Sequence, residues 1–144
     1  FGISFHRKKP QFRGGYYIHI APGDSFIATG FWDPNKDDLF RIRKEMEIDA
    51  QELLGIMAKP KFKKHWGSLQ GEEVKTAPKG FSKEHADIDL IKKKQYIFLK
   101  KFSDKEVLAP DFQKEIVTHF EAIRPFFDYM SSILTTDLNG VSLL

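Results

Sequence analysis

Alternating residues near the amino terminus predict two antiparallel strands joined by a tight turn. Tyr16, Ile18 and Ile20 alternate with residues of different character, and residues 25–31 are again rich in aromatic and β-branched side chains, which suit a pleated strand. Between the two runs stands Pro22-Gly23-Asp24, in which proline fixes φ, glycine accepts a positive φ and aspartate can bond its own backbone. The pattern predicts a hairpin.

The length of the loop decides which side chains share a face of this hairpin. A three-residue loop pairs Ile18 with Ala28 and places Tyr17 and His19 on the same face as Ile27. A loop one residue longer changes every pair, because a slip of one residue moves each side chain to the other face of the sheet. We take the three-residue loop as the expectation and the longer loop as the alternative.

Two more strands are predicted from shorter patterns. Phe1, Ile3 and Phe5 alternate along residues 1–7, and this strand would complete a meander of three strands with the hairpin. Residues 95–102 include the run Tyr-Ile-Phe-Leu, which is apolar on both faces. Such a run is typical of a strand inside a sheet and under helices.

Helical spacing begins after the hairpin. Asp33-Pro34 has the pattern of a helix start, with aspartate as the N-cap and proline at the first helical position. Leu39, Ile42 and Met46 then form an apolar stripe that indicates an amphipathic helix. Residues 49–52, Asp-Ala-Gln-Glu, are similar to a capping box and predict a second, short helix.

The last third of the chain predicts a long closing helix. Ser103 and Glu106 have the spacing of a capping box, and Pro110 follows where a helix can begin. Apolar side chains then recur at steps of three or four, at Phe112, Ile116, Phe120, Ile123, Phe127 and Met130. Pro125 must kink or split this helix, because proline removes a backbone donor and clashes with the preceding turn.

These elements predict an α+β fold. We expect a mainly antiparallel sheet, built as a hairpin or meander, packed by several helices and closed by a long carboxyl-terminal helix. No repeat or linker divides the sequence, so residues 1–144 are predicted to form a single domain. The chain begins at Phe1, inside a predicted strand, and we expect it to be the carboxyl-terminal part of a longer natural chain.

Composition narrows the class of protein. Apolar residues make up 41% of the chain, and 14 phenylalanines predict an aromatic core. The absence of cysteine excludes disulfides, thiol nucleophiles and cysteine metal sites, and suits a reducing compartment. The apolar runs are far shorter than the roughly 20 residues of a membrane span, and no signal-peptide pattern opens the chain. We expect a soluble, cytoplasmic protein with no membrane partner.

The charge is mildly basic and unevenly distributed. The 23 basic and 20 acidic residues give a net charge of +3, less than a dedicated nucleic-acid-binding domain carries. Lysines cluster at residues 8–9, 59–64, 92–94 and 100–101. We expect these clusters to be solvated faces and protection for strand edges, so nucleic acid is not the favoured partner.

No familiar catalytic or metal-binding motif is present. The five histidines, His6, His19, His65, His85 and His119, form no H-x-H or H-E-x-x-H pair, so no metal site is predicted. The sequence also lacks the Gly-x-Ser-x-Gly elbow of serine hydrolases and the glycine-rich phosphate loop that ends in Lys-Ser or Lys-Thr. The catalytic residues and cofactor therefore stay unknown.

The sequence resembles a family of bacterial and fungal proteins called domain of unknown function 2461. The matching motifs are Gly14-Gly15-Tyr16-Tyr17-Ile18-His19-Ile20, Pro22-Gly23, Gly30-Phe31-Trp32 with Pro34, Pro78-Lys79-Gly80-Phe81 with His85, residues 90–94 and the closing helix with Pro125. Members of the family usually carry a preceding helical part and an Arg/Asp/Lys-rich run, both absent here. The resemblance implies a fold but no activity, because the family has none established.

Two functional hypotheses follow. In the first, a small-molecule or anion-binding pocket, with or without an enzymatic activity, takes a phosphate- or carboxylate-bearing ligand, because fixed cations pair well with such oxyanions. The residues that we predict for it are His6, Arg7, Tyr17, His19, Lys79 and His85. In the second, the lysine clusters and exposed aromatic residues bind nucleic acid or a protein.

The two hypotheses differ in what they require of the structure. The pocket hypothesis requires His19, Lys79 and His85 to lie within reach of one cleft. The binding-module hypothesis requires the lysine clusters to converge on one face. We favour the pocket, because the net charge is modest.

Overall fold

A four-stranded antiparallel sheet forms one layer of the molecule. The computed structural model describes residues 1–144, and the strands stand in the order β1-β2-β3-β4. Their bounds are Gly2–His6 for β1, Gly15–His19 for β2, Ser25–Phe31 for β3 and Tyr96–Phe102 for β4. The first three strands form the predicted meander, so the amino-terminal alternation identified both the strands and their order.

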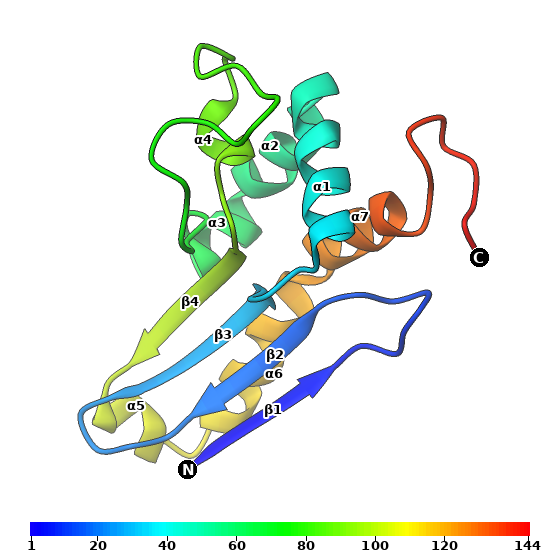
Figure 1. The fold of residues 1–144 in the computed structure, drawn as a ribbon. Coiled ribbons are helices and arrows are strands. Elements are labelled where there is room, and N and C mark those ends of the chain that lie inside the picture. Colours follow the sequence, from blue (N-terminus) through cyan, green and yellow to red (C-terminus); the bar gives the residue numbers. More distant parts are fainter.

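Seven helices complete the α+β fold. They are α1 (Lys36–Ile48), α2 (Gln51–Ala58), α3 (Pro60–Trp66), α4 (Ile88–Ile91), α5 (Asp104–Leu108), α6 (Phe112–Ala122) and α7 (Arg124–Leu134). Helices α1 to α4 gather at one end of β3 and β4, whereas α6 runs behind the sheet (Figure 1). None of these helices combines the length and the apolar character needed to cross a membrane.

The hairpin register differs from the three-residue loop that we expected. Ile18 pairs with Ile27, not with Ala28. The turn is longer because the Ser25 hydroxyl turns back on Ala21, accepting from its N–H at 3.1 Å and donating to its carbonyl at 3.0 Å. Tyr17 and His19 therefore share the open face of the sheet with Ala28, whereas Ile18 and Ile27 face the helices.

Strand β4 lies at an edge of the sheet, and its predicted central position was wrong. Its only strand partner is β3. The free edge is partly closed by Gln70, which exchanges backbone hydrogen bonds with Ile97. A single bridge of this kind satisfies local backbone groups and blunts the edge. On the faces of β4, Tyr96 and Phe98 are fully buried, whereas Leu99 is 36% exposed.

The helix starts follow side-chain capping where the capping group is present. Helix α1 begins after Asn35, whose side chain accepts from the N–H of Asp38, and not at Asp33-Pro34 as expected. Ser103 and Glu106 form the predicted capping box at α5. Pro125 splits the closing helix, as predicted, into α6 and α7 with the junction at Ile123.

The core lies between the sheet and the closing helices and is largely aromatic. Phe98 of β4 packs edge-on against Phe126 of α7, and Tyr16 of β2 packs against Phe127 and Phe120. Phe98, Phe126 and Phe127 are fully buried. Because α6 and α7 cover only one face of the sheet, the other face is left to solvent (Figure 1).

Candidate functional site

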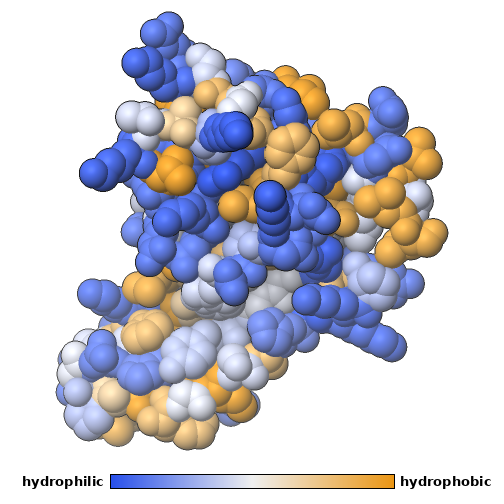
Figure 2. Space-filling view, in the orientation of Figure 1, coloured by the Kyte–Doolittle hydropathy of each residue, from blue (hydrophilic) through white to orange (hydrophobic).

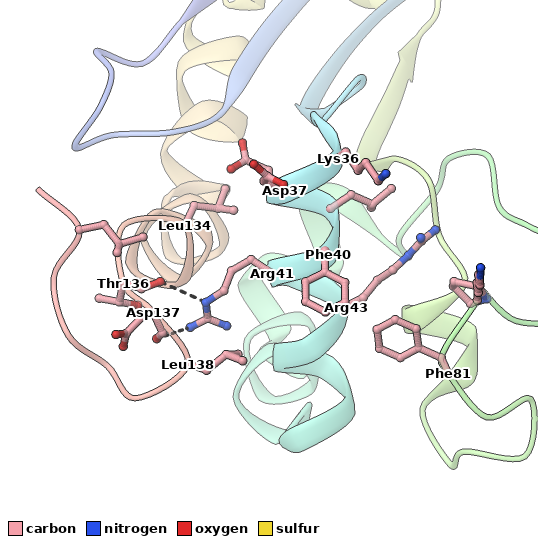
Figure 3. Close-up of a pocket in the computed structure, with 15 residues that line it drawn as sticks. Lys36, Asp37, Phe40, Arg41, Arg43, Phe81, Leu134, Thr136, Asp137 and Leu138 are labelled. Atoms are coloured by element: carbon pink, nitrogen blue, oxygen red, sulfur yellow. Dashed lines mark hydrogen bonds between the residues drawn. The ribbon is translucent and has the colours of Figure 1, made fainter.

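A cavity of about 630 Å³ extends along helix α1. Lys36, Phe40 and Arg43 line it at spacings of four and three residues, so they lie on one face of the helix. Figure 3 shows Phe40 pointing outward from this face, with Lys36 towards one end and Arg43 beside it. Phe40 is 52% exposed, so this face presents an aromatic ring between two cations.

A loop opposite α1 supplies one wall of the cavity. Pro78, Lys79 and Phe81 line it, and the ring of Phe81 packs edge-on against Phe40 with centroids 6.2 Å apart. The Lys44 ammonium lies 5.1 Å from the centre of the Phe81 ring, a cation–π contact that helps to hold the two aromatics together.

The carboxyl-terminal segment supplies the other wall. Arg41 donates from Nε to the Thr136 carbonyl at 3.1 Å and from Nη2 to the Asp137 carbonyl at 3.1 Å, as Figure 3 shows. These bonds fasten the segment to α1 and bring Leu138 and Leu143 to the cavity. Apolar side chains gather over this segment (Figure 2), and Leu143 is 65% exposed.

Three cations at the cavity have no carboxylate partner. Lys36, Arg43 and Lys79 take part in none of the ion pairs of the structure. Arg43 instead donates to the carbonyls of Ile91 and Lys93, at 2.9 and 2.8 Å. Burial lowers the pKa of Arg43, and the hydroxyl of the neighbouring Tyr96 partly offsets this decrease.

The carboxylates at the cavity are mostly engaged elsewhere. Asp38 pairs with Arg13, and the Asp137 side chain accepts from the backbone N–H groups of Asn139 and Val141. Asp37 lies in the first turn of α1, where the helix dipole favours a negative charge. Neither of these contacts removes the charge of Asp37 or Asp137, so the charge left without an ion pair at the cavity is three cations against two carboxylates, a small positive excess.

The six predicted site residues do not converge on one cavity. The cavity along α1 contains Lys79, and a polar cavity of about 290 Å³ contains His6. Two further cavities, of about 330 and 280 Å³, contain none of the six. Arg7 pairs with Asp128 at 2.9 Å. These three residues thus lie in three different environments.

The other three predicted residues also separate. On the open face of the sheet, the Tyr17 hydroxyl hydrogen-bonds to His19 Nδ1 at 3.2 Å. His85 lies on the loop after Phe81, and its Nε2 contacts the Glu47 carbonyl near the end of α1 at 3.0 Å. Lys79 and His85 therefore share a loop against α1, and Tyr17 and His19 belong to the sheet.

The residues that the sequence reasoning missed are Lys36, Phe40 and Arg43. Their spacing of four and three residues was readable as a second stripe of α1, beside the apolar stripe of Leu39 and Ile42. It was overlooked because a charged and aromatic stripe is ordinarily a solvated helix face. Only the packing of the 78–81 loop against that face makes it a cavity wall.

The lysine clusters occupy several parts of the fold. Lys8 and Lys9 lie in the connection between β1 and β2, whereas the cluster at 59–64 belongs to α3 and the residue before it. Lys92 and Lys93 approach Glu73, at 3.8 and 3.5 Å. The remaining pair, at 100–101, lies in β4, where consecutive side chains point to opposite faces.

Comparison with known proteins identifies the family but no characterised relative. No curated protein and no solved structure matches the chain. A family model described as a conserved hypothetical protein, DUF2461, matches residues 1–129, a segment that includes α1 and the 78–81 loop. Because the match covers most of its 144 residues, the chain belongs to the DUF2461 family.

Proposed function

We propose that the protein binds an anionic small molecule in the cavity along α1. The ligand class is a carboxylate or phosphate attached to an apolar or aromatic group. Its oxyanion would lie among Lys36, Arg43 and Lys79, and its apolar part against Phe40 and Phe81. Cations pair well with such oxyanions, and concave sites with an apolar lining and few polar groups are typical of small-molecule binding.

The observation that carries the proposal is the set of three cations without ion-pair partners at one cavity. Most lysines and arginines of the chain form no ion pair, so the lack of a partner alone does not distinguish these three. What distinguishes Lys36, Arg43 and Lys79 is that all three line the same cavity. An anionic ligand would supply the missing charge.

Binding is favoured over catalysis by the chemistry of the lining. No histidine, cysteine or serine lines the cavity. Aspartates, which can also act as general bases, do line it, but Asp38 is paired with Arg13 and Asp137 accepts from two backbone N–H groups. Thr136 lines it, but its hydroxyl donates to the Ser132 carbonyl at 2.8 Å. An enzymatic activity on the bound oxyanion stays a prediction from the sequence.

The test is a titration with ligands that differ only in charge. We expect phenylacetate and phenyl phosphate to bind, measured by calorimetry and by amide shifts of residues 36–43 and 78–81, and benzylamine not to shift these amides. The double variant Lys36→Gln, Lys79→Gln should bind about five- to tenfold more weakly, since each exposed ion pair contributes about 0.5–0.7 kcal/mol.

A matched control separates local charge from net charge. Lys64 and Lys114 are exposed lysines of α3 and α6 that do not line the cavity. The variant Lys64→Gln, Lys114→Gln loses the same net charge and should keep the affinity of the wild type. Equal losses in both double variants, or binding of benzylamine at the same amides, would contradict the proposal.

Two other predictions from the sequence, a binding module and a cytoplasmic location, stay predictions. The binding-module alternative, with nucleic acid or a protein as partner, is favoured by no specific observation, because the lysine clusters are distributed over several elements. The proposed cytoplasmic location is supported by the lack of cysteine, which suits a reducing compartment.

A further inference from the structure

A second cavity, of about 330 Å³, lies on the opposite flank of α1. Arg41, Glu45 and Asp49 recur at steps of four residues along this flank, and Glu52 follows from the first turn of α2. Helix α7 and the carboxyl-terminal segment close the other side with Tyr129, Ser132, Ile133, Thr136, Leu138 and Gly140.

The lining of this cavity is acidic. Arg41 is its only basic residue, and its charge is matched by Glu45, with Nη1 3.0 Å from Oε1. Asp49 and Glu52 form no ion pair, although Asp49 Oδ1 accepts from the Gln51 N–H at 2.9 Å. Two carboxylates are thus left without a cation.

An independent observation comes from Tyr129 on α7. Its side chain lines the cavity, the residue is only 7% exposed, and its buried hydroxyl has no hydrogen-bond partner. A buried hydroxyl that makes no hydrogen bond is unfavourable, because it has lost its bonds to water. Burial raises the pKa of Tyr129, and the nearby Glu45, Glu52 and Asp49 raise it further, so the hydroxyl lies in the field of the same carboxylates.

We propose that this cavity binds an organic ammonium group, such as that of an alkyl diamine or of a lysine side chain. An ammonium nitrogen carries three N–H donors and no acceptor. Two donors would meet the free carboxylate oxygens of Asp49 and Glu52, and the third would meet the lone pair of the Tyr129 hydroxyl. The ligand would supply a positive charge to the two carboxylates and a hydrogen-bond donor to the Tyr129 hydroxyl.

The alternative of a metal ion fits the site less well. The structure contains no group of three or more histidine, aspartate or glutamate side chains placed to hold a metal. Glu45 is held by Arg41, and Asp49 has one oxygen committed to the backbone of Gln51. A bulkier cation with directional N–H donors can reach carboxylates that are too far apart to coordinate one ion.

The experiment uses 1,5-diaminopentane as the probe and the whole chain as the protein. We expect saturable amide shifts at Ser132, Gly140 and Glu52 in NMR titrations, with a dissociation constant below about 10 mM. Tetramethylammonium carries the same charge without N–H donors and should not produce these shifts, nor should sodium chloride at equal ionic strength.

Three variants locate the site. Glu52→Gln should weaken binding about fivefold and Tyr129→Phe about threefold, corresponding to the loss of one charge-assisted and one neutral hydrogen-bond partner. Tyr129→Phe removes a hydroxyl that has no partner, so the variant should fold as the wild type does. Glu84→Gln, a loss of the same charge in an exposed loop outside the cavity, should leave binding unchanged.

Three results would overturn the proposal. They are an absence of saturable shifts, an equal response to tetramethylammonium, and an equal loss of affinity in the Glu52 and Glu84 variants. None of these results depends on the anionic ligand proposed for the other flank of α1, because the probe, the amides and the variants are different.

Discussion

Gly30 of β3 lies so close to Tyr96 of β4 that a side chain at residue 30 would collide with the Tyr96 carbonyl. The φ of Gly30 is 137°, and an added Cβ would also come within 2.8 Å of the Ile97 α-carbon. The close approach joins the predicted meander to β4 at the end of the sheet that faces α1.

Substitution of Gly30 is expected to be strongly destabilising. Gly30→Ala should lower the free energy of unfolding by about 2–4 kcal/mol, because the Cβ meets backbone atoms that cannot move aside and the positive φ is strained for alanine. Urea denaturation followed by circular dichroism measures the change.

Gly55 provides the matched control. It lies inside α2, and a Cβ there would meet nothing within 4 Å. Gly55→Ala should raise stability by about 0.5–1 kcal/mol, because alanine has the higher helix propensity. Similar losses in both variants would mean that the close approach of β3 and β4 is not what requires glycine.

Arg43 lines the cavity, and its two hydrogen bonds to backbone carbonyls are predicted to stabilise the fold as well. Arg43→Met removes both donors to the Ile91 and Lys93 carbonyls and should lower the free energy of unfolding by about 1–3 kcal/mol. Arg43→Lys keeps the charge but not the forked geometry of the guanidinium, so its free energy of unfolding should lie between those of Arg43→Met and the wild type. Arg124→Lys, at an exposed residue, should change stability by less than about 0.5 kcal/mol.

His119 should make the fold sensitive to acid. Burial lowers the pKa of His119, His65 and Lys100 lower it further, and contacts with Glu115 oppose the change. The unfolded chain, with the ordinary histidine pKa, therefore binds the proton more readily than the folded protein does. The contribution of neutral His119 to the free energy of unfolding is complete above about pH 6.5, and it is lost as the pH falls through the lower pKa of the folded state.

Two measurements check the role of His119. His119→Gln should reduce the difference in unfolding free energy between pH 7.5 and 5.5, about one unit either side of the ordinary histidine value. In NMR titrations, His65→Gln should raise the pKa of His119, since the ring centroids are 4.8 Å apart and the two imidazoles repel when charged. An unchanged pKa in that variant would contradict the assignment.

The capping box at α5 can be tested with one exposed residue. The Ser103 hydroxyl accepts from the Glu106 N–H at 3.2 Å. Ser103→Ala removes this acceptor and should lower the free energy of unfolding by about 1 kcal/mol. Ser68 is also exposed, and its hydroxyl makes no hydrogen bond of the structure. Ser68→Ala should therefore leave the midpoint of thermal unfolding nearly unchanged.

The predicted fold was mostly right because local patterns determine most of its elements. Period-two alternation identified the meander, and the capping box and Pro125 placed α5 and the split of the closing helix. The hairpin register was wrong because it depends on one hydroxyl, that of Ser25, which local propensity does not weigh. The position of β4 was wrong because an apolar run indicates burial of a strand's faces and not the number of its strand partners. Its free edge is partly closed by Gln70, more than twenty residues away in sequence.

The candidate site was less predictable for a related reason. Four of the six residues chosen from the sequence, Tyr17, His19, Lys79 and His85, belong to the matching motifs, whereas His6 and Arg7 do not. Their separation in space follows from the tertiary arrangement alone. Lys79 could be found from its motif. The helical stripe of Lys36 and Arg43 could be read from the sequence, but its place at a cavity could not, because that depends on a loop some forty residues later that packs on α1.

Arg41 gives the two cavities a common wall. It lines both, and its bonds to Thr136 and Asp137 hold the segment that closes them. If a ligand on one flank displaces this guanidinium, it changes the affinity of the other flank by a definite factor, and thermodynamic linkage requires the reverse effect to have the same size. A competition experiment between phenylacetate and 1,5-diaminopentane would therefore report the coupling free energy across α1 directly.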